Sequence, residues 1–230
     1  MNLSERDEKL RELMDSPDCD PKRLHATLRR FGVVNRLVAG WDTVYRSRLR
    51  DALAGLSRPA RVLDIGSGGG DVVVRLAHLA DRDGLRVDWT GVDPDPRAHE
   101  VARSRQAPGV TFLCTDAETL LERGDTFDVV ISNHVLHHLD DAELTAFTET
   151  SLQLATTMVL HGDIARSRLA YGLFAVGITP LAPGTFLRTD GLRSIRRSFH
   201  PGELSDALGT GWTVFSPTPF RLIAQGDGRA

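Results

Sequence analysis

Five short apolar runs between positions 61 and 160 alternate with longer stretches that can form helices. The runs read RVLDI, VDWTGVD, VTFLC, FDVVIS and TTMVL. Short buried strands that alternate with helices are typical of a parallel sheet covered on both faces. The sequence therefore predicts an α/β fold with a doubly wound, mostly parallel sheet.

Two further apolar runs, WTVF and FRLIA, lie near the end of the chain and are separated only by SPTP. A connection this short joins antiparallel strands, because a parallel pair needs a long crossover. We therefore expect seven strands, with an antiparallel hairpin at one sheet edge and an antiparallel last strand.

The N-terminal part of the chain has a different texture. Apolar residues recur at helical spacing over 3–14 and 22–56. We expect a helical cap over residues 1–58, broken around Pro17 to Pro21 and near Gly32. Residues 59–230 would then form the ligand-binding domain.

The segment 164–200 interrupts the strand–helix alternation with glycine, proline and aromatic residues. Its length favours a lid or a substrate-binding insertion, and an irregular connector is the alternative. Basic residues recur at helical spacing within it, and they would either meet a carboxylate or phosphate on a substrate or form a solvated basic face. These residues are Arg193, Arg196 and Arg197.

Composition excludes several classes of protein. The chain has 230 residues, 41% hydrophobic residues and a net charge of −3, which fits a globular protein and lacks the basic field of a nucleic-acid binder. No apolar run is long enough to span a bilayer or resembles a signal peptide, so we expect a cytoplasmic protein without membrane contact. Two cysteines, Cys19 and Cys114, cannot form a disulfide framework.

A glycine-rich turn follows the first predicted strand, in the run VLDIGSGGGD over positions 62–71. Glycines at a strand-to-helix turn let the backbone approach a ligand closely. A dinucleotide motif would need a third glycine where Asp71 stands, which disfavours NAD and FAD. Asp64 lies inside the strand end, where a carboxylate needs hydrogen-bond donors or a cation such as an ammonium group.

Two more acids follow the next two strands. Asp93 and Pro94 end the second strand, and a carboxylate there can accept hydrogen bonds from the two hydroxyls of a ribose. Asp116 and Ala117 follow the third strand, where Asp116 would accept from an adenine amino group, act as a helix N-cap, or do both.

Together these motifs, with FDVVISNHVLHHLDD, resemble the class I S-adenosylmethionine-dependent methyltransferases. The sequences of these motifs are similar to those of the branch that includes ubiquinone- and menaquinone-biosynthesis methyltransferases and polyketide-tailoring enzymes. The resemblance implies S-adenosylmethionine as the cofactor, S-adenosylhomocysteine as the product, and a Rossmann-like methyltransferase fold over 59–230. The residues that it implies for cofactor binding are Asp64, Gly66, Ser67, Gly68, Gly70, Asp71, Asp93, Pro94, Asp116, Ala117 and Asn133.

Three histidines follow the fourth strand, and we expect them to begin a helix that places His134, His137 and His138 on one face. Three interpretations stay open. In the first, the segment is the family's usual helix start, with one histidine packed under the cofactor and another partly exposed. In the second, His134 or His137 is a general base for a phenol or enol. In the third, the three imidazoles bind a metal. We predict no required metal.

The acceptor that we expect is a small, largely apolar aromatic molecule, such as a phenol, a polyketide or a quinone precursor, methylated on oxygen or carbon. A non-catalytic cofactor-binding protein and a nicotinamide-dependent oxidoreductase are the alternatives. The protein would be a monomer or homodimer. The expected substrate-pocket residues are Trp41, Tyr45, His161, Asp163, Tyr171 and Phe174.

Overall fold

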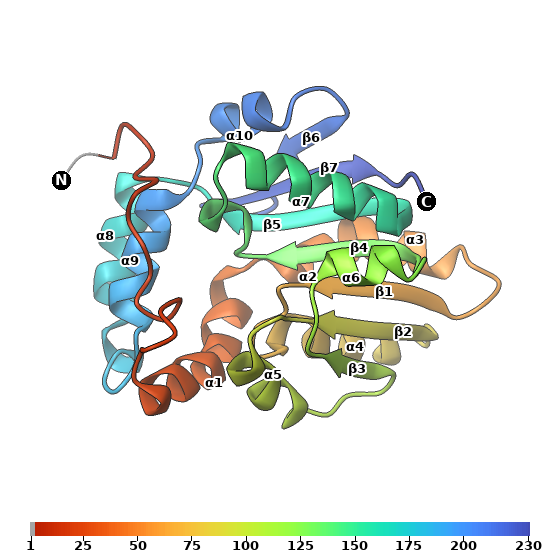
Figure 1. Ribbon diagram of the computed structural model, residues 1–230, viewed down its shortest axis with the longest axis horizontal. Coiled ribbons are helices and arrows are strands. Elements are labelled where there is room, and N and C mark those ends of the chain that lie inside the picture. The colour runs from red at the N-terminus through yellow and green to blue at the C-terminus, as the bar shows by residue number, and fades with distance from the viewer. Residues whose placement is uncertain (1–2) are drawn as a thin grey trace.

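The computed structural model describes residues 3–230 and contains a seven-stranded sheet in the order β3-β2-β1-β4-β5-β7-β6 (Figure 1). All strands run parallel except β7, which is antiparallel to both of its neighbours. The predicted fold class, the terminal hairpin and the reversed last strand are therefore confirmed. The strands are β1 (Ala60–Ile65), β2 (Val87–Val92), β3 (Val110–Leu113), β4 (Phe127–Asn133), β5 (Ala155–Ile164), β6 (Trp212–Phe215) and β7 (Arg221–Asp227).

Both faces of the sheet are apolar, as a parallel sheet requires. Successive side chains of a strand point to opposite faces, so Val62 and Leu63 of β1 enter two different core clusters. The first cluster is covered by α4 and the short helices before β1, and the second by α6 and α7. These helices are α2 (Trp41–Val44), η1 (Tyr45–Leu49), α3 (Arg50–Ala54), α4 (Asp71–Arg82), α6 (Ala117–Glu122) and α7 (Asp141–Leu154).

The prediction for the first 58 residues is correct in one part and wrong in another. α1 (Pro21–Val38) begins where the proline break was expected, with Asp20 as its N-cap. It continues through Gly32 without a break, since a single helical glycine costs only about 1 kcal/mol. The helix ends before Gly40, whose φ of 74° is left-handed.

Residues 3–14, predicted to be helical, are irregular. We call residues 3–20 the N-terminal strap; it crosses α9 (Leu187–Arg197) (Figure 1). Side chains of α9 take the strap's backbone groups: Arg197 donates to the Leu10 carbonyl at 2.6 Å, and Asp190 accepts from the backbone N–H groups of Leu13 and Met14 at 2.9 Å. These tertiary bonds replace the bonds that a helix would make.

The segment 164–200 contains α8 (Arg168–Gly177), η3 (Thr179–Leu181) and α9, and it lies at the carboxyl ends of the parallel strands (Figure 1). The segment is tied to α1, because the Thr27 hydroxyl accepts from the Phe186 N–H at 2.8 Å and Arg30 donates to the Leu181 carbonyl at 2.8 Å. We call the strap, α1 and the segment 164–200 the cover. Its action as a lid stays a prediction.

Two remaining helices, α5 (Pro96–Arg103) and α10 (Pro201–Leu208), flank the two ends of the sheet (Figure 1). Over residues 3–230, no helix combines the length and the apolar character needed to cross a membrane.

Candidate active site

The glycine-rich turn leads from β1 into α4 at the carboxyl edge of the sheet. Gly66, Gly68 and Gly70 have φ values of 68°, 53° and 74°, which a residue with a side chain adopts only at a cost. The Ser67 N–H donates to the Val92 carbonyl at 2.9 Å, which ties the turn to β2. A Cβ atom added at Gly68 would meet no atom within 4 Å, so the backbone is open to a ligand there.

Three carboxylates gather around this turn. The Asp93 carboxylate accepts from the N–H groups of Gly68 and Asp95 at 2.9 Å, and the Asp71 carboxylate accepts from the Asn35 amide at 2.9 Å. Asp64 is 2% exposed, and its Oδ1 has no hydrogen-bond partner within residues 3–230. Burial and the neighbouring Asp71 and Asp93 raise the pKa of Asp64 well above its usual value. A cationic ligand would relieve this cost.

Asp116 lies at the carboxyl end of β3 and is exposed. It accepts from the Thr119 N–H at 2.8 Å, so the predicted N-cap role in α6 is confirmed. Hydrogen bonding to the side chain and then the backbone of Thr119 lowers the pKa of Asp116. Its contact with an adenine stays a prediction, and the same holds for Ala117, which is buried as the first residue of α6.

Asn133, at the end of β4, joins three elements. Its Oδ1 accepts from Trp41 Nε1 at 2.9 Å and from Arg221 Nη2 at 3.0 Å. Gly162 of β5 makes room for this arrangement, because a Cβ atom there would come within 3.0 Å of the Trp41 ring. Trp41, expected in the substrate pocket, therefore lies beside a residue expected at the cofactor.

His134 has a left-handed φ of 63°, and its Nε2 lies 3.0 Å from Arg221 Nη1. Only a single 3-10 turn, η2 (Leu136–His138), follows, so the helix expected over these histidines is wrong. The three rings still cluster, with centroids 6.0 Å apart for His134 and His137 and 4.3 Å apart for His137 and His138. Burial and the Arg221 cation lower the pKa of His134 well below its usual value, so this imidazole is neutral.

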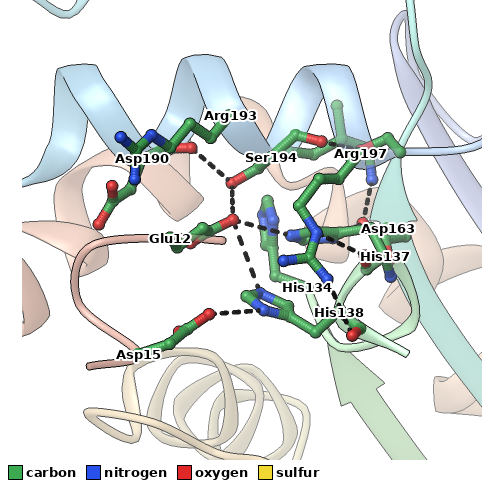
Figure 2. A network of polar contacts seen from close by, with 12 residues as sticks. Glu12, Asp15, His134, His137, His138, Asp163, Asp190, Arg193, Ser194 and Arg197 are labelled. Carbon is green, nitrogen blue, oxygen red and sulfur yellow. Dashed lines mark hydrogen bonds and ion pairs between the residues drawn. The ribbon is translucent and has the colours of Figure 1, made fainter. Parts of the chain in front are cut away.

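His137 is held by carboxylates on both sides of its ring (Figure 2). Its Nδ1 lies 2.7 Å from Asp163 Oδ1, and its Nε2 lies 3.2 Å from Glu12 Oε1 of the strap. Glu12 also accepts from the Ser194 hydroxyl of α9 at 2.5 Å. Burial by itself lowers the pKa of His137, but Asp163 and Glu12 outweigh it and raise the pKa to about 9. The ring is therefore an imidazolium at neutral pH.

Two groups of side chains here have metal-binding chemistry, with ligand atoms within 4.8 Å of one another. The first joins Glu12, His137 and His138, and the second joins His134, His137 and Asp163 (Figure 2). A metal needs a neutral imidazole, whereas both carboxylates favour the protonated form of His137. Catalysis without a metal stays our prediction.

His161 was expected in the substrate pocket, but it lies within the core of the sheet. His161 packs between Phe147 and Trp212 and pairs with Ser132, and strand alternation places it on the opposite face of the sheet from Gly162 and Trp41. Burial lowers the pKa of His161 to about 3.

Three further aromatic residues were expected in the substrate pocket, and their contact with an acceptor stays a prediction. Tyr45 is fully buried and donates to Asp83 just beyond α4. Phe174 packs on α9, because a Cβ atom at Gly191 would lie 2.4 Å from its ring. Tyr171 is half-buried on α8.

The expected alternatives for the arginines of α9 are both wrong for Arg197, which is 1% exposed and donates to the carbonyls of His137, His138 and Leu10. Arg196 pairs with Asp7 at 2.5 Å, and Arg193 donates to the Arg11 carbonyl at 2.6 Å. These side chains fasten the strap.

Residues 62–156 match a family model described as a methyltransferase domain. The chain carries a methyltransferase domain. The matched residues hold the glycine-rich turn, the acids at the carboxyl ends of β1, β2 and β3, and the histidines after β4. The cover and β7 lie outside the matched part of the methyltransferase domain.

Curated relatives agree with this match. The chain is 32% identical over 120 residues to the ubiquinone biosynthesis O-methyltransferase of Brucella anthropi, which covers 51% of this chain and 46% of that protein. It is 30% identical over 159 residues to the enzyme of the same name from Mesorhizobium japonicum, covering 65% and 57%. The chain thus spans about half the length of the curated relatives it matches.

Solved methyltransferases share the fold. The plantazolicin methyltransferase BpumL, solved with a triazolic desmethylPZN analog and SAH, has a TM-score of 0.57 at 15% identity and covers 91% of this chain and 98% of its own. The CurJ carbon methyltransferase has a TM-score of 0.64 at 18% identity and covers 93% and 62%. The methyltransferase fold thus extends beyond residues 62–156.

Sequence reasoning missed Glu12, Arg221 and the fastening role of Arg197. Arg221 carries a readable signal, since it is a cation at the start of the apolar run RLIA. Glu12 carries none, because it is one acid among several in a charged segment and meets His137 only through the fold.

Proposed function

We propose that this protein transfers a methyl group from S-adenosylmethionine to oxygen or carbon of a small aromatic acceptor. The observation that carries the proposal is the buried Asp64 carboxylate, with an unpartnered oxygen, beside a glycine turn that is open at Gly68. A ligand with an ammonium group could pair with the Asp64 carboxylate while it lies against the exposed backbone at Gly68. The methyltransferase family match and the ubiquinone-biosynthesis relatives support the same assignment.

When bound, S-adenosylmethionine supplies a methyl carbon made electrophilic by a positive sulfur. We propose that Asp64, Asp71 and the turn hold the amino-acid end. Asp93 with Pro94 would hold the ribose, and Asn133 would lie beside the sulfur. The remaining proposed contacts come from Gly66, Ser67, Gly68, Gly70, Asp116 and Ala117. The cover over this edge would exclude water and orient the acceptor.

His134 has a neutral imidazole and lies next to Asn133 along the chain, but Arg221 donates to its Nε2, so the ring has no free lone pair for a general base. We propose instead that its Nδ1–H group orients the acceptor oxygen. His137 is already protonated and held on both ring nitrogens, so we assign it a positioning role for the strap and η2. Trp41 would form a wall of the acceptor pocket. We further propose that the acceptor is a free small molecule and that the protein acts in the cytoplasm as a monomer or homodimer.

Calorimetric titration tests the cofactor. S-adenosylmethionine and S-adenosylhomocysteine should bind in the micromolar range, which corresponds to about −8 kcal/mol, and NADH should not bind. Asp64→Asn and Asp93→Ala should each weaken binding by at least about tenfold, since each removes a charged acceptor. Asp88→Asn, an exposed acid on β2, is the matched control and should leave binding unchanged.

Two results would contradict the proposal. Binding of NADH without S-adenosylhomocysteine would point to an oxidoreductase. Tight cofactor binding without turnover across phenols, enols and quinone precursors would point to a non-catalytic binding protein.

A further inference from the structure

Arg221, the first residue of β7, is a buried cation without a carboxylate partner. Arg221 is 3% exposed, and it takes part in no ion pair among residues 3–230. Its two terminal nitrogens meet only uncharged groups, His134 Nε2 and Asn133 Oδ1, both at 3.0 Å. Its Nε is buried and has no hydrogen-bond partner.

The other buried arginines are satisfied differently. Arg166 pairs with Glu203 and donates to three backbone carbonyls, and Arg197 donates to three carbonyls. The carboxylate that acts most on Arg221 is Asp163, but its oxygens already accept from His137 and Ile164. Of these three buried arginines, Arg221 is thus the one whose Nε has no hydrogen-bond partner.

Burying a cation without a carboxylate partner costs desolvation free energy, yet the Arg221 guanidinium stays charged. Burial lowers the pKa of Arg221 only to about 10, so the guanidinium is protonated at neutral pH. The titratable groups that face Arg221 and His134 are Asp163 of β5 and His137 and His138 of η2. His134 is neutral, and Asp163 is engaged with the His137 imidazolium, so no carboxylate among residues 3–230 pairs with the Arg221 guanidinium.

Arg221 also lies where an acceptor is needed. It pairs with Ile164 in the β5–β7 register, and Gly162 pairs with Ile223, so strand alternation places Arg221 on the face that carries Gly162 and Trp41. Arg221 and Trp41 donate to the same Asn133 oxygen. A planar guanidinium with free donors beside an indole suits a flat aromatic anion.

We infer that Arg221, with His134, forms a site for an anionic oxygen of the acceptor. The inference rests on the proposed function and narrows its substrate class to acidic oxygen compounds, namely phenols, enols and aromatic carboxylic acids. The acceptor loses its proton to solvent on binding, and the Arg221 cation favours the resulting anion. Arg221 is then the residue that selects the acceptor by charge.

The test compares two probes of matched shape, 4-fluorobenzoate and 4-fluorobenzamide, by ¹⁹F NMR titration with and without S-adenosylhomocysteine. The unmodified protein should bind the anion at least about tenfold more tightly than the amide, as expected for charge-assisted hydrogen bonds. Arg221→Met should abolish this preference, and Arg221→Lys should keep part of it. Arg229→Met removes an exposed arginine paired with Glu149 and should change nothing.

Equal binding of the two probes by the unmodified protein overturns the inference, and so does an undiminished preference in a folded Arg221→Met variant. If that variant unfolds by circular dichroism, the unmodified protein and Arg221→Lys decide the matter. The two proposals fail separately. Anion preference without S-adenosylhomocysteine binding removes the cofactor assignment, and cofactor binding without anion preference removes only the acceptor site.

Discussion

At the scale of single residues, His137 links protein stability to pH. Its folded pKa of about 9 exceeds the ordinary value of 6.5, so its stabilising contribution is complete below about pH 6.5 and is lost as pH rises through 9. The shift corresponds to about 3 kcal/mol. Denaturant unfolding of the unmodified protein should therefore show the free energy of unfolding falling by roughly this amount between pH 6.5 and 10.

His137→Asn should flatten this dependence, because the variant carries no titrating group between Asp163 and Glu12. His78→Asn, an exposed histidine of α4, is the matched control and should retain the slope of the unmodified protein. Parallel stability curves for the unmodified protein and His137→Asn would show that the ring is not an imidazolium in the folded state.

At the scale of elements, Arg197 of α9 joins the strap to η2. Arg197→Met removes the donor of the Leu10 and His138 carbonyls, while the His137 carbonyl keeps Arg6 as a donor, and it should destabilise the protein by about 3 kcal/mol. The strap should then open locally more often. Limited trypsin digestion followed by mass spectrometry should show faster cleavage after Lys9 and Arg11, both within the strap.

Arg193→Met is the control for this experiment, since Arg193 makes one exposed bond to the Arg11 carbonyl. It should leave both the melting temperature and the cleavage rate nearly unchanged. Equal cleavage of the Arg197 and Arg193 variants would mean that the strap is held mainly by its other contacts.

At the scale of the whole molecule, the cover and the glycine turn should respond together to the cofactor. α1 already contacts the turn, because a Cβ atom at Gly69 would lie 3.0 Å from the Leu28 carbonyl and Asn35 bonds Asp71. Saturation with S-adenosylhomocysteine at 100 times its dissociation constant should stabilise the protein by about 2.7 kcal/mol. Hydrogen exchange should slow in residues 62–71 and in α1, while α10, at the far sheet edge, stays unchanged.

Protection confined to the glycine turn would separate the cover from cofactor binding. It would also favour the irregular-connector interpretation of 164–200 over a lid.

The predicted parts of the site share one property, which is that each lies at the end of a local pattern. Asp64 lies at the end of an apolar run, Asp93 and Asp116 follow the next two runs, and parallel strands bring their carboxyl ends to one edge. Arg221 lies on the strand that reverses direction, so its approach to Asn133 depends on the sheet order. The predicted helix over residues 3–14 does not form, because arginines of α9, far away in sequence, donate to the carbonyls of this segment.

The sequence by itself determined the α/β architecture and the row of acids at the sheet edge, because short continuous apolar runs and turn glycines act over a few residues. Only the tertiary structure decided the charges of the histidines. His137 meets Glu12 across 125 positions and becomes an imidazolium, whereas His134 meets Arg221 across 87 positions and stays neutral. A pKa depends on burial and on neighbours in space, and neither is written in the local sequence.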